Sequence, residues 1–186
     1  ADAITGDFYY NSSTGQFKTV TDGGAPIGSW SSGGNMNTGR LGIAGFGNTT
    51  PTAFAAGGEN PGGKVGNVES YNGSSWTETT DINTARMYQV GDGSSTAGII
   101  AGGETSPGNV TNVELWNGSA WTETTDMNTA TRIAGGTKST TNTAVLSFGG
   151  LAPSATAKNE YWNGSSWTEL NDLNTARYGL AGAGVY

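Results

Sequence analysis

Cysteine and histidine are both absent from this sequence of 186 residues. The lack of cysteine excludes disulfides, thiolate metal ligands and a cysteine nucleophile. The lack of histidine removes the commonest general base and metal ligand, so a serine nucleophile would have to rely on one of the lysines, Lys18, Lys64, Lys138 and Lys158. We therefore expect a protein that is not an enzyme, with no catalytic residues, no metal site and no cofactor.

Positive charge and long apolar runs are also scarce. Eight basic residues stand against 15 acidic ones, which gives a net charge of −7, and no stretch gathers lysine or arginine. A nucleic-acid partner is therefore not expected. No apolar run reaches the length of about 18 residues that a membrane helix needs, so we expect no membrane insertion.

Glycine is abundant, with 32 residues, and the chain also holds six tryptophans, seven tyrosines and five phenylalanines. Low charge and high glycine content are typical of disordered linkers, but so many aromatic side chains are not. The glycines are better explained as residues of tight turns between short strands.

A unit of about 45 residues is repeated along the chain. The sequence Asn-Gly-Ser-Ser/Ala-Trp-Thr-Glu occurs at residues 72–78, 117–123 and 163–169, and a weaker copy ends at Trp30. The tryptophans at the repeated position are 46, 45 and 46 residues apart, and they are Trp30, Trp76, Trp121 and Trp167. Ten residues after each tryptophan stand Arg40, Arg86, Thr131 and Arg177, and apolar runs end in the glycine pairs Gly57–Gly58, Gly102–Gly103 and Gly149–Gly150.

Each period has room for four short strands, which we call a, b, c and d. In the unit that starts at Arg86, the expected strands are a at residues 87–90, b at 97–101, c at 112–116 and d at 120–123. The Asn-Gly pair between c and d predicts a two-residue type I′ hairpin turn. Repeated four-stranded units of 40 to 50 residues are typical of propeller blades.

The two ends of the chain are complementary. After Arg177 the chain supplies only strand a, and the N-terminal region has candidates for b at residues 4–10, c at 16–21 and d at 28–31 but none for a. We therefore predict an all-β fold, a single four-bladed propeller over residues 1–186, closed by the C-terminal strand. The blades would be residues 177–186 with 1–39, then 40–85, 86–130 and 131–176. The alternative is a slice of a longer array that closes by oligomerisation.

The paired glycines, the aromatic residue, the tryptophan and the following arginine resemble the kelch repeat over residues 40–177. The Asn-Gly-Ser-Ser-Trp-Thr and Asn-Thr-Ala-Arg variants are similar to kelch-like structural and fibre proteins of marine tailed bacteriophages. This resemblance implies a viral protein of the virion surface or tail fibre, extracellular in location, with a host glycan or host protein and other virion proteins as its partners.

The residues repeated in every unit are expected to be structural. The tryptophans offer large surfaces for packing between blades, although they could also stack on sugars. The repeated arginines and the glutamates Glu69, Glu114 and Glu160 would form ion pairs or cap backbone carbonyls, although an arginine cluster around an axis could bind a carboxylate. Asp92, in a glycine-rich loop, could hold a cation.

Loops that vary over a constant scaffold are the usual place for binding specificity. The b–c loops at residues 59–66, 104–111 and 151–158 differ from blade to blade, whereas the d–a connectors are nearly constant. The expected ligand-binding residues are Glu59, Asn60, Lys64, Glu104, Thr105, Asn109, Thr111, Ser154, Thr156 and Lys158. We expect a binding module that recognises a host glycan or protein. The alternatives are a purely structural assembly component, and a glycosidase that uses paired carboxylates.

Overall fold

The computed structural model describes residues 8–11, 16–19, 32–49 and 52–184. The chain folds as two compact units, residues 1–33 and residues 34–186. In the first unit, β1 (Phe8–Asn11) and β2 (Gln16–Thr19) form an antiparallel hairpin in which Phe8 pairs with Thr19. These strands overlap the segments expected as b and c, while residues 4–7, 20–21 and 28–31 of the predicted strands lie outside the described residues.

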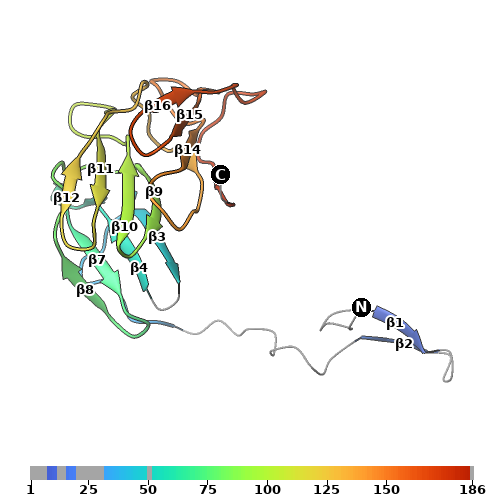
Figure 1. Ribbon diagram of the computed structural model, residues 1–186. Helices are drawn as coiled ribbons and strands as arrows, with labels where there is room; N and C mark the ends of the chain where they lie inside the picture. Colours follow the sequence, from blue (N-terminus) through green and yellow to red (C-terminus); the bar gives the residue numbers. More distant parts are fainter. Residues whose placement is uncertain (1–7, 12–15, 20–31, 50–51, 185–186) are drawn as a thin grey trace. The chain divides into compact units, whose positions relative to one another are not determined.

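The second unit contains three antiparallel sheets of four strands each (Figure 1). The first has the order β3-β4-β7-β8, the second β9-β10-β11-β12 and the third β13-β14-β15-β16. Their bounds are β3 Ala44–Thr49, β4 Thr52–Ala56, β7 Val68–Tyr71, β8 Trp76–Thr79, β9 Val90–Ser94, β10 Ala97–Ala101, β11 Val113–Trp116, β12 Trp121–Glu123, β13 Gly135–Gly136, β14 Val145–Phe148, β15 Asn159–Trp162 and β16 Trp167–Glu169. A small hairpin, β5 (Glu59–Asn60) with β6 (Gly63–Lys64), lies in the first b–c loop.

The described residues form strands, turns and loops without a helix, and they include no helix that is long and apolar enough to cross a membrane. The prediction of an all-β chain built from antiparallel sheets of up to four strands is confirmed. The three sheets have the same strand order, and each is formed by one of three successive repeats. Their arrangement is therefore compatible with propeller blades.

Two local predictions were wrong. Strand a of the second sheet lies at Val90–Ser94 and not at residues 87–90, because Tyr88 has a left-handed backbone with φ of 61° that cannot continue a strand. The c–d connection is a four-residue loop and not a two-residue turn, since Tyr71 pairs directly with Trp76. The side-chain oxygen of Asn72 accepts hydrogen bonds from the backbone N–H groups of Ser74 and Ser75, which closes this longer loop.

A chain of backbone hydrogen bonds joins successive repeats on the side where strand a lies, which we call the inner edge of each repeat. Tyr88 N–H donates to Gly42 O at 2.7 Å, Ile133 N–H donates to Tyr88 O at 3.0 Å, and Gly179 N–H donates to Ile133 O at 3.0 Å. All four residues have a positive φ, although only two of them are glycines. The backbone geometry is therefore set by the repeat, and Tyr88 and Ile133 adopt it against their own preference.

The core lies between the sheets. Trp116 and Trp121 of the second sheet pack with Phe46, Ala56 and Val68 of the first, and the rings of Phe46 and Trp121 meet edge to face at 5.7 Å. Between the second and third sheets, Trp162 and Trp167 pack in the same way against the apolar residues Ile99, Val113 and Met127. The aromatic pairs of the second and third sheets thus each fill the junction with the preceding sheet.

The paired glycines allow the neighbouring backbone to approach closely. Gly103 N–H donates to Thr131 O at 2.8 Å, and a Cβ on Gly102 would lie only 2.7 Å from that same oxygen. Gly102 also has a φ of 64°. The pairs Gly57–Gly58 and Gly149–Gly150 have the same contacts and the same left-handed geometry. Glycine is required here because a side chain would both strain the backbone and collide with a carbonyl group.

Replacement of Gly102 by alanine should therefore lower the free energy of unfolding by about 2 kcal/mol, because a left-handed alanine alone costs roughly 1–2 kcal/mol. Chemical denaturation measures this change. Gly108→Ala is the matched control, since no atom lies within 4 Å of its Cβ position and its φ is not positive. Equal stability of the two variants would refute this role of the glycine pair.

Candidate functional site

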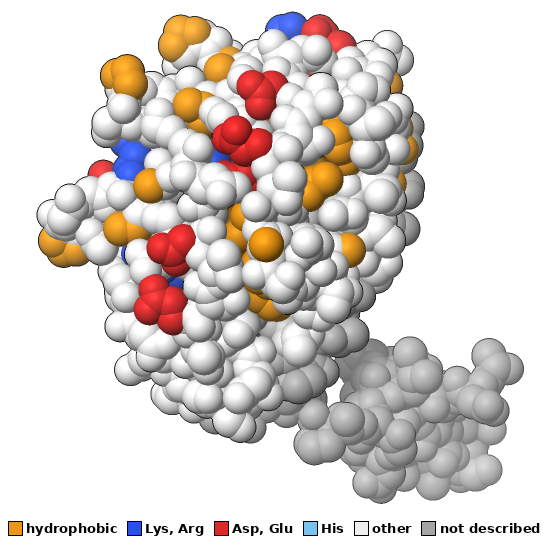
Figure 2. Space-filling view, turned by 60° about the vertical axis from the view of Figure 1, so that its left-hand side comes forward, with side chains coloured by type: hydrophobic (Ala, Val, Ile, Leu, Met, Phe, Trp, Pro, Cys, Tyr) orange, Lys and Arg blue, Asp and Glu red, His pale blue; other side chains and the backbone are white. Residues whose placement is uncertain are grey.

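The b–c loops and the d–a connectors lie at the same end of the sheets. The first residue of each b–c loop forms an isolated bridge with the residue that follows a connector: Glu59 with Leu41, Glu104 with Met87, and Leu151 with Arg132. Two kinds of segment therefore build one face, which we call the loop face. Figure 2 shows one side of the molecule, where most of the surface is uncharged and the acidic side chains form small groups, some of them beside basic side chains.

The larger hollow on the loop face has a volume of about 530 Å³. It lies where the second and third b–c loops meet the connector between them, and its lining is Gly108, Asn109, Asn128, Thr129, Ala130, Arg132, Ala152 and Pro153. This lining offers amide, hydroxyl and backbone groups together with small apolar surfaces. It contains no aromatic ring, so a ligand would be held there by hydrogen bonds and shape rather than by stacking.

A second hollow of about 410 Å³ occupies the corresponding place two repeats earlier. Its lining is Gly39, Arg40, Leu41, Glu59, Asn60 and Pro61. Both hollows are therefore formed by a b–c loop beside a connector, as the repeat requires. Of the expected ligand-binding residues, Glu59 and Asn60 line this hollow, and Asn109 lines the larger one.

Three charged side chains join consecutive repeats across the loop face. The carboxylate of Glu104 accepts from Lys64 Nζ at 3.3 Å on one side and pairs with Arg132 on the other. Lys64 belongs to the first b–c loop and Arg132 to the start of the third repeat. Glu104 and Lys64 thus fix the loops relative to one another, and the arginine holds the wall of the larger hollow.

Most of the expected ligand residues make hydrogen bonds or ion pairs within the protein, Asn109 among them. Asn109 Nδ2 donates to Leu151 O at 2.6 Å, and Thr111 Oγ1 donates to Asp126 at 3.0 Å. Lys158 Nζ donates to Glu169 at 2.9 Å. The Thr105 hydroxyl donates to Gly108 O within its own loop, and the Thr156 hydroxyl accepts from Lys158 N–H within another. Ser154 is exposed. The structure brings these residues to one face but distributes them over three loops.

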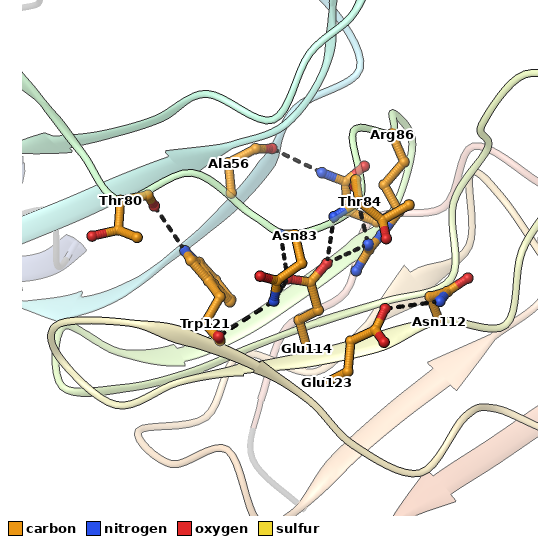
Figure 3. Close-up of polar contacts among 10 residues, drawn as sticks. Ala56, Thr80, Asn83, Thr84, Arg86, Asn112, Glu114, Trp121 and Glu123 are labelled. Atoms are coloured by element: carbon orange, nitrogen blue, oxygen red, sulfur yellow. Dashed lines mark hydrogen bonds and ion pairs between the residues drawn. The ribbon is translucent and has the colours of Figure 1, made fainter.

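The repeated glutamates accept hydrogen bonds from the d–a connectors, as Figure 3 shows for Glu114. Its carboxylate accepts from the backbone N–H of Asn83 at 2.7 Å and of Thr84 at 3.3 Å, and it pairs with Arg86 at 2.6 Å. The Asn83 side chain donates both to this carboxylate and to Trp121 O. We call the four residues that approach the glutamate, here residues 83–86, the tip of the connector.

The same arrangement occurs at the other two junctions. Glu69 accepts from Asn37 N–H at 2.7 Å and pairs with Arg40 at 3.2 Å, and Glu160 accepts from Asn128 N–H at 2.8 Å. Thr131 replaces the arginine in the third tip. The arginines therefore do not gather around an axis as a carboxylate-binding cluster would require, since Arg40 and Arg86 pair with separate glutamates at separate junctions.

Burial lowers the pKa of Arg86 and of Arg40, and the neighbouring glutamates act in the opposite direction. The side chains of Arg86 and Glu114 are both completely buried. A buried carboxylate is tolerated when donors surround it, and here the backbone, an amide and a guanidinium supply them. The junction therefore depends on a charge that cannot be removed without leaving its partner unpaired.

The fourth tip, residues 174–177, approaches no glutamate among the described residues. Arg177 is exposed, and its Nε donates to Thr175 O at 3.3 Å. Trp76, Trp121 and Trp167 lie in or beside the junctions, and Trp121 Nε1 donates to Thr80 O at 3.1 Å. Trp30 lies outside the described residues.

A further cavity of about 230 Å³ lies where the inner edges of the repeats meet. Its lining comes from four segments, residues 43–45, 89–91, 134–138 and 180–182. Lys138 Nζ reaches across it and donates to Gly91 O at 2.6 Å and Gly45 O at 3.2 Å. Desolvation lowers the pKa of this ammonium group, and Asp92 acts in the opposite direction. Lys138 thus links three repeats.

Asp92 connects the second and third sheets. Its carboxylate accepts from Thr137 Oγ1 at 2.7 Å, from Ser139 N–H at 2.5 Å and from Gly93 N–H at 2.7 Å, and the residue is 1% exposed. Protein donors therefore occupy the oxygens that a cation would need. Among the described residues, no cluster of three acidic side chains suited to a metal ion occurs.

Sequence reasoning missed Lys138 and Arg132. Neither stands at a position shared by the repeats, so the comparison of repeats that identified Arg86 and Glu114 gave no signal for them. Lys138 follows the glycine-rich residues 134–136 at the inner edge. A single positive charge at that place is the one feature of the sequence that could have indicated a contact between repeats.

Comparison with known proteins finds no protein-family model that matches the chain and no curated protein with a similar sequence.

Replacement of Glu114 by glutamine should lower the free energy of unfolding by about 3 kcal/mol, because removing one charge of a buried pair leaves the other uncompensated. Thermal or chemical denaturation measures the loss. Glu123→Gln on the adjacent strand is the control, since Glu123 is exposed and the change should stay within about 0.5 kcal/mol. Similar stability of both variants would contradict the proposed dependence on the buried carboxylate.

Lys138 should make stability depend on alkaline pH. Because its pKa in the folded state lies below the ordinary 10.5, the unfolded chain binds more protons between those two values, and stability contributed at this site rises with pH across that window. The difference in unfolding free energy between the wild type and Lys138→Met should therefore change in favour of the wild type as pH rises to 10.5.

The control for this experiment is Lys158→Met. The hydrogen bond to Glu169 raises the pKa of Lys158, so its stabilising contribution is present below 10.5 and is lost as pH rises through the raised value. The difference in unfolding free energy between wild type and variant should therefore rise with pH just below 10.5 for Lys138→Met, and fall with pH just above 10.5 for Lys158→Met. A flat difference for Lys138→Met would show that its ammonium is not desolvated at the inner cavity.

Proposed function

We propose that this chain is a non-enzymatic binding module, a kelch-like β-propeller of a tailed-phage virion surface or tail fibre, which recognises a host glycan or host protein through its loop face. The observation that carries the proposal is the pair of hollows at the first and third junctions, each built from a variable b–c loop beside a nearly constant connector. Such a division between constant scaffold and variable loops is typical of binding proteins.

The chemistry of the larger hollow favours a neutral, hydroxyl-rich ligand. Thr129 supplies a hydroxyl group and Asn109 an amide oxygen. The amide of Asn128 donates to Glu160 and to Trp167 O, and the guanidinium of Arg132 is paired with Glu104, so neither adds a free charge to the hollow. A glycan presents the matching donors and acceptors, and a polar loop of a host protein presents similar ones. The attribution to a phage virion rests on the resemblance of the repeat sequence alone.

The three sheets and the fourth inner segment, residues 180–182, support the propeller part of the proposal. Closure into four blades by the N-terminal unit remains a prediction, because the positions of the two units relative to one another are not determined.

A purely structural role in a virion is favoured by a different observation. The chain of Lys64, Glu104 and Arg132 uses three charged side chains of the loop face for contacts within the protein. A structural protein that contacts only other virion proteins would need those intramolecular ion pairs to keep its shape and would not need a ligand.

Gly108→Trp tests the binding role, because an indole at this open position would fill the larger hollow without straining the backbone. Binding of the labelled protein to host cells and to a glycan array should fall at least tenfold. The control is Thr96→Trp, in the exposed a–b turn between β9 and β10, at the opposite end of the strands from the loop face. Undiminished binding of Gly108→Trp, or no binding of the wild type to any host surface, would favour the structural role instead.

A further inference from the structure

The lining of the larger hollow carries polar groups that have no hydrogen-bond partner among the described residues. Arg132 pairs with Glu104 through Nη1, which leaves its Nε and Nη2 without an acceptor. The side-chain nitrogen of Asn109 donates to Leu151 O, and its side-chain oxygen accepts from no described residue. The hydroxyl group of Thr129, which is half-buried, also makes no hydrogen bond there. The hollow therefore offers a donor, an acceptor and a group that can act as either.

The rest of the lining is small and apolar. Ala130, Ala152 and Pro153 contribute methyl and ring CH₂ groups beside the three polar side chains. The lining holds no aromatic ring on which the apolar face of a sugar could stack. A sugar is therefore best held there through a substituent that combines hydrogen-bonding groups with a small apolar group.

The polar groups are fixed before any ligand arrives. Glu104 orients the guanidinium of Arg132, and Leu151 O orients the amide of Asn109 at 2.6 Å. These contacts join the second and third repeats, to which the whole lining belongs. A ligand that matches this spacing is bound without the cost of ordering the side chains.

On the basis of the proposed binding function, we propose that the larger hollow is a subsite for a 2-acetamido sugar and that it recognises the acetamido group. The carbonyl oxygen of that group accepts from Arg132 Nη2, and its N–H donates to Asn109 Oδ1. Its methyl group packs against Ala130, Ala152 and Pro153, while a ring hydroxyl bonds to Thr129. The acetamido group is neutral, as a hollow without a free charge requires.

A peptide backbone presents the same amide chemistry but is favoured less by the loops. Their backbone groups already bond within the protein: Thr105 N–H donates to Gly108 O at 2.9 Å, and Ala152 N–H donates to Ser154 O at 2.8 Å. Leu151 O accepts from Asn109. A peptide binds most readily where a series of free backbone groups can pair with it, and these loops do not supply such an edge.

The test compares sugars that differ only in the acetamido group. The methyl glycosides of N-acetylglucosamine and N-acetylgalactosamine are titrated into the full chain beside methyl glucoside and methyl galactoside, with binding followed by NMR chemical shifts. At least one acetamido glycoside should bind at least about tenfold more tightly than its parent sugar, because the parent leaves Arg132 and Asn109 unpaired. Since the full chain includes residues 1–33, such binding also requires that they leave the hollow open.

Two variants separate the contacts. Arg132→Lys keeps a cation beside Glu104 but lacks the second donor nitrogen of the guanidinium, so it should abolish the preference for the acetamido glycoside. Thr129→Val removes the hydroxyl group at nearly constant volume and should weaken acetamido and parent sugars alike. Thr122→Val is the matched control, because Thr122 is an exposed threonine of β12 outside the lining, and it should leave binding unchanged.

Equal binding of acetamido and parent sugars to the wild type, or an unchanged preference in Arg132→Lys, would overturn the proposal. N-acetylglycine N-methylamide serves as the peptide probe, and its binding as tightly as the glycosides would assign the hollow to a peptide and overturn it too. If the full chain binds host cells and the acetamido glycosides neither bind nor compete, the subsite is refuted while the proposed function stands. Absence of binding to host surfaces and to the glycosides would refute both.

Discussion

The structure depends on a buried carboxylate that belongs to one sheet and is satisfied by donors from the connector before it. Glu69, Glu114 and Glu160 are 1%, 0% and 2% exposed, yet each lies within reach of backbone N–H groups that a turn would otherwise leave to water. A carboxylate in such a place is stable only when the next tip is in position. This requirement joins each sheet to its neighbour more specifically than apolar packing alone, which tolerates sliding.

The third junction shows how much of this arrangement the arginine supplies. Thr131 replaces it, and Glu160 accepts hydrogen bonds from the backbone N–H and the side-chain amide of Asn128. The repeat's positive charge stands one residue later as Arg132, which turns to the loop face and pairs with Glu104. Backbone and amide donors therefore suffice to hold the glutamate. The tip can therefore lack its arginine, and at the third junction Arg132, one residue later, lines the larger hollow.

The spacing of Trp76, Trp121 and Trp167 predicted the number and register of the described sheets because these side chains must fill equivalent junctions. The glycine pairs were recognisable for a similar reason, since a carbonyl group lies where their side chains would be. Strand a could not be placed correctly, because Tyr88 and Ile133 adopt left-handed backbones that neither residue prefers, and only the hydrogen bonds between repeats impose them.

The candidate site was predictable only in its location. Variation among the b–c loops indicated the loop face, but the partners of Glu104 lie 40 residues earlier and 28 residues later in the chain, and nothing in a single repeat signals such contacts. These same contacts decide what kind of surface the loop face is. Since Lys64, Glu104 and Arg132 already hold successive repeats together, a ligand in the larger hollow meets walls whose positions are fixed beforehand, and its binding need not cost the ordering of three separate loops.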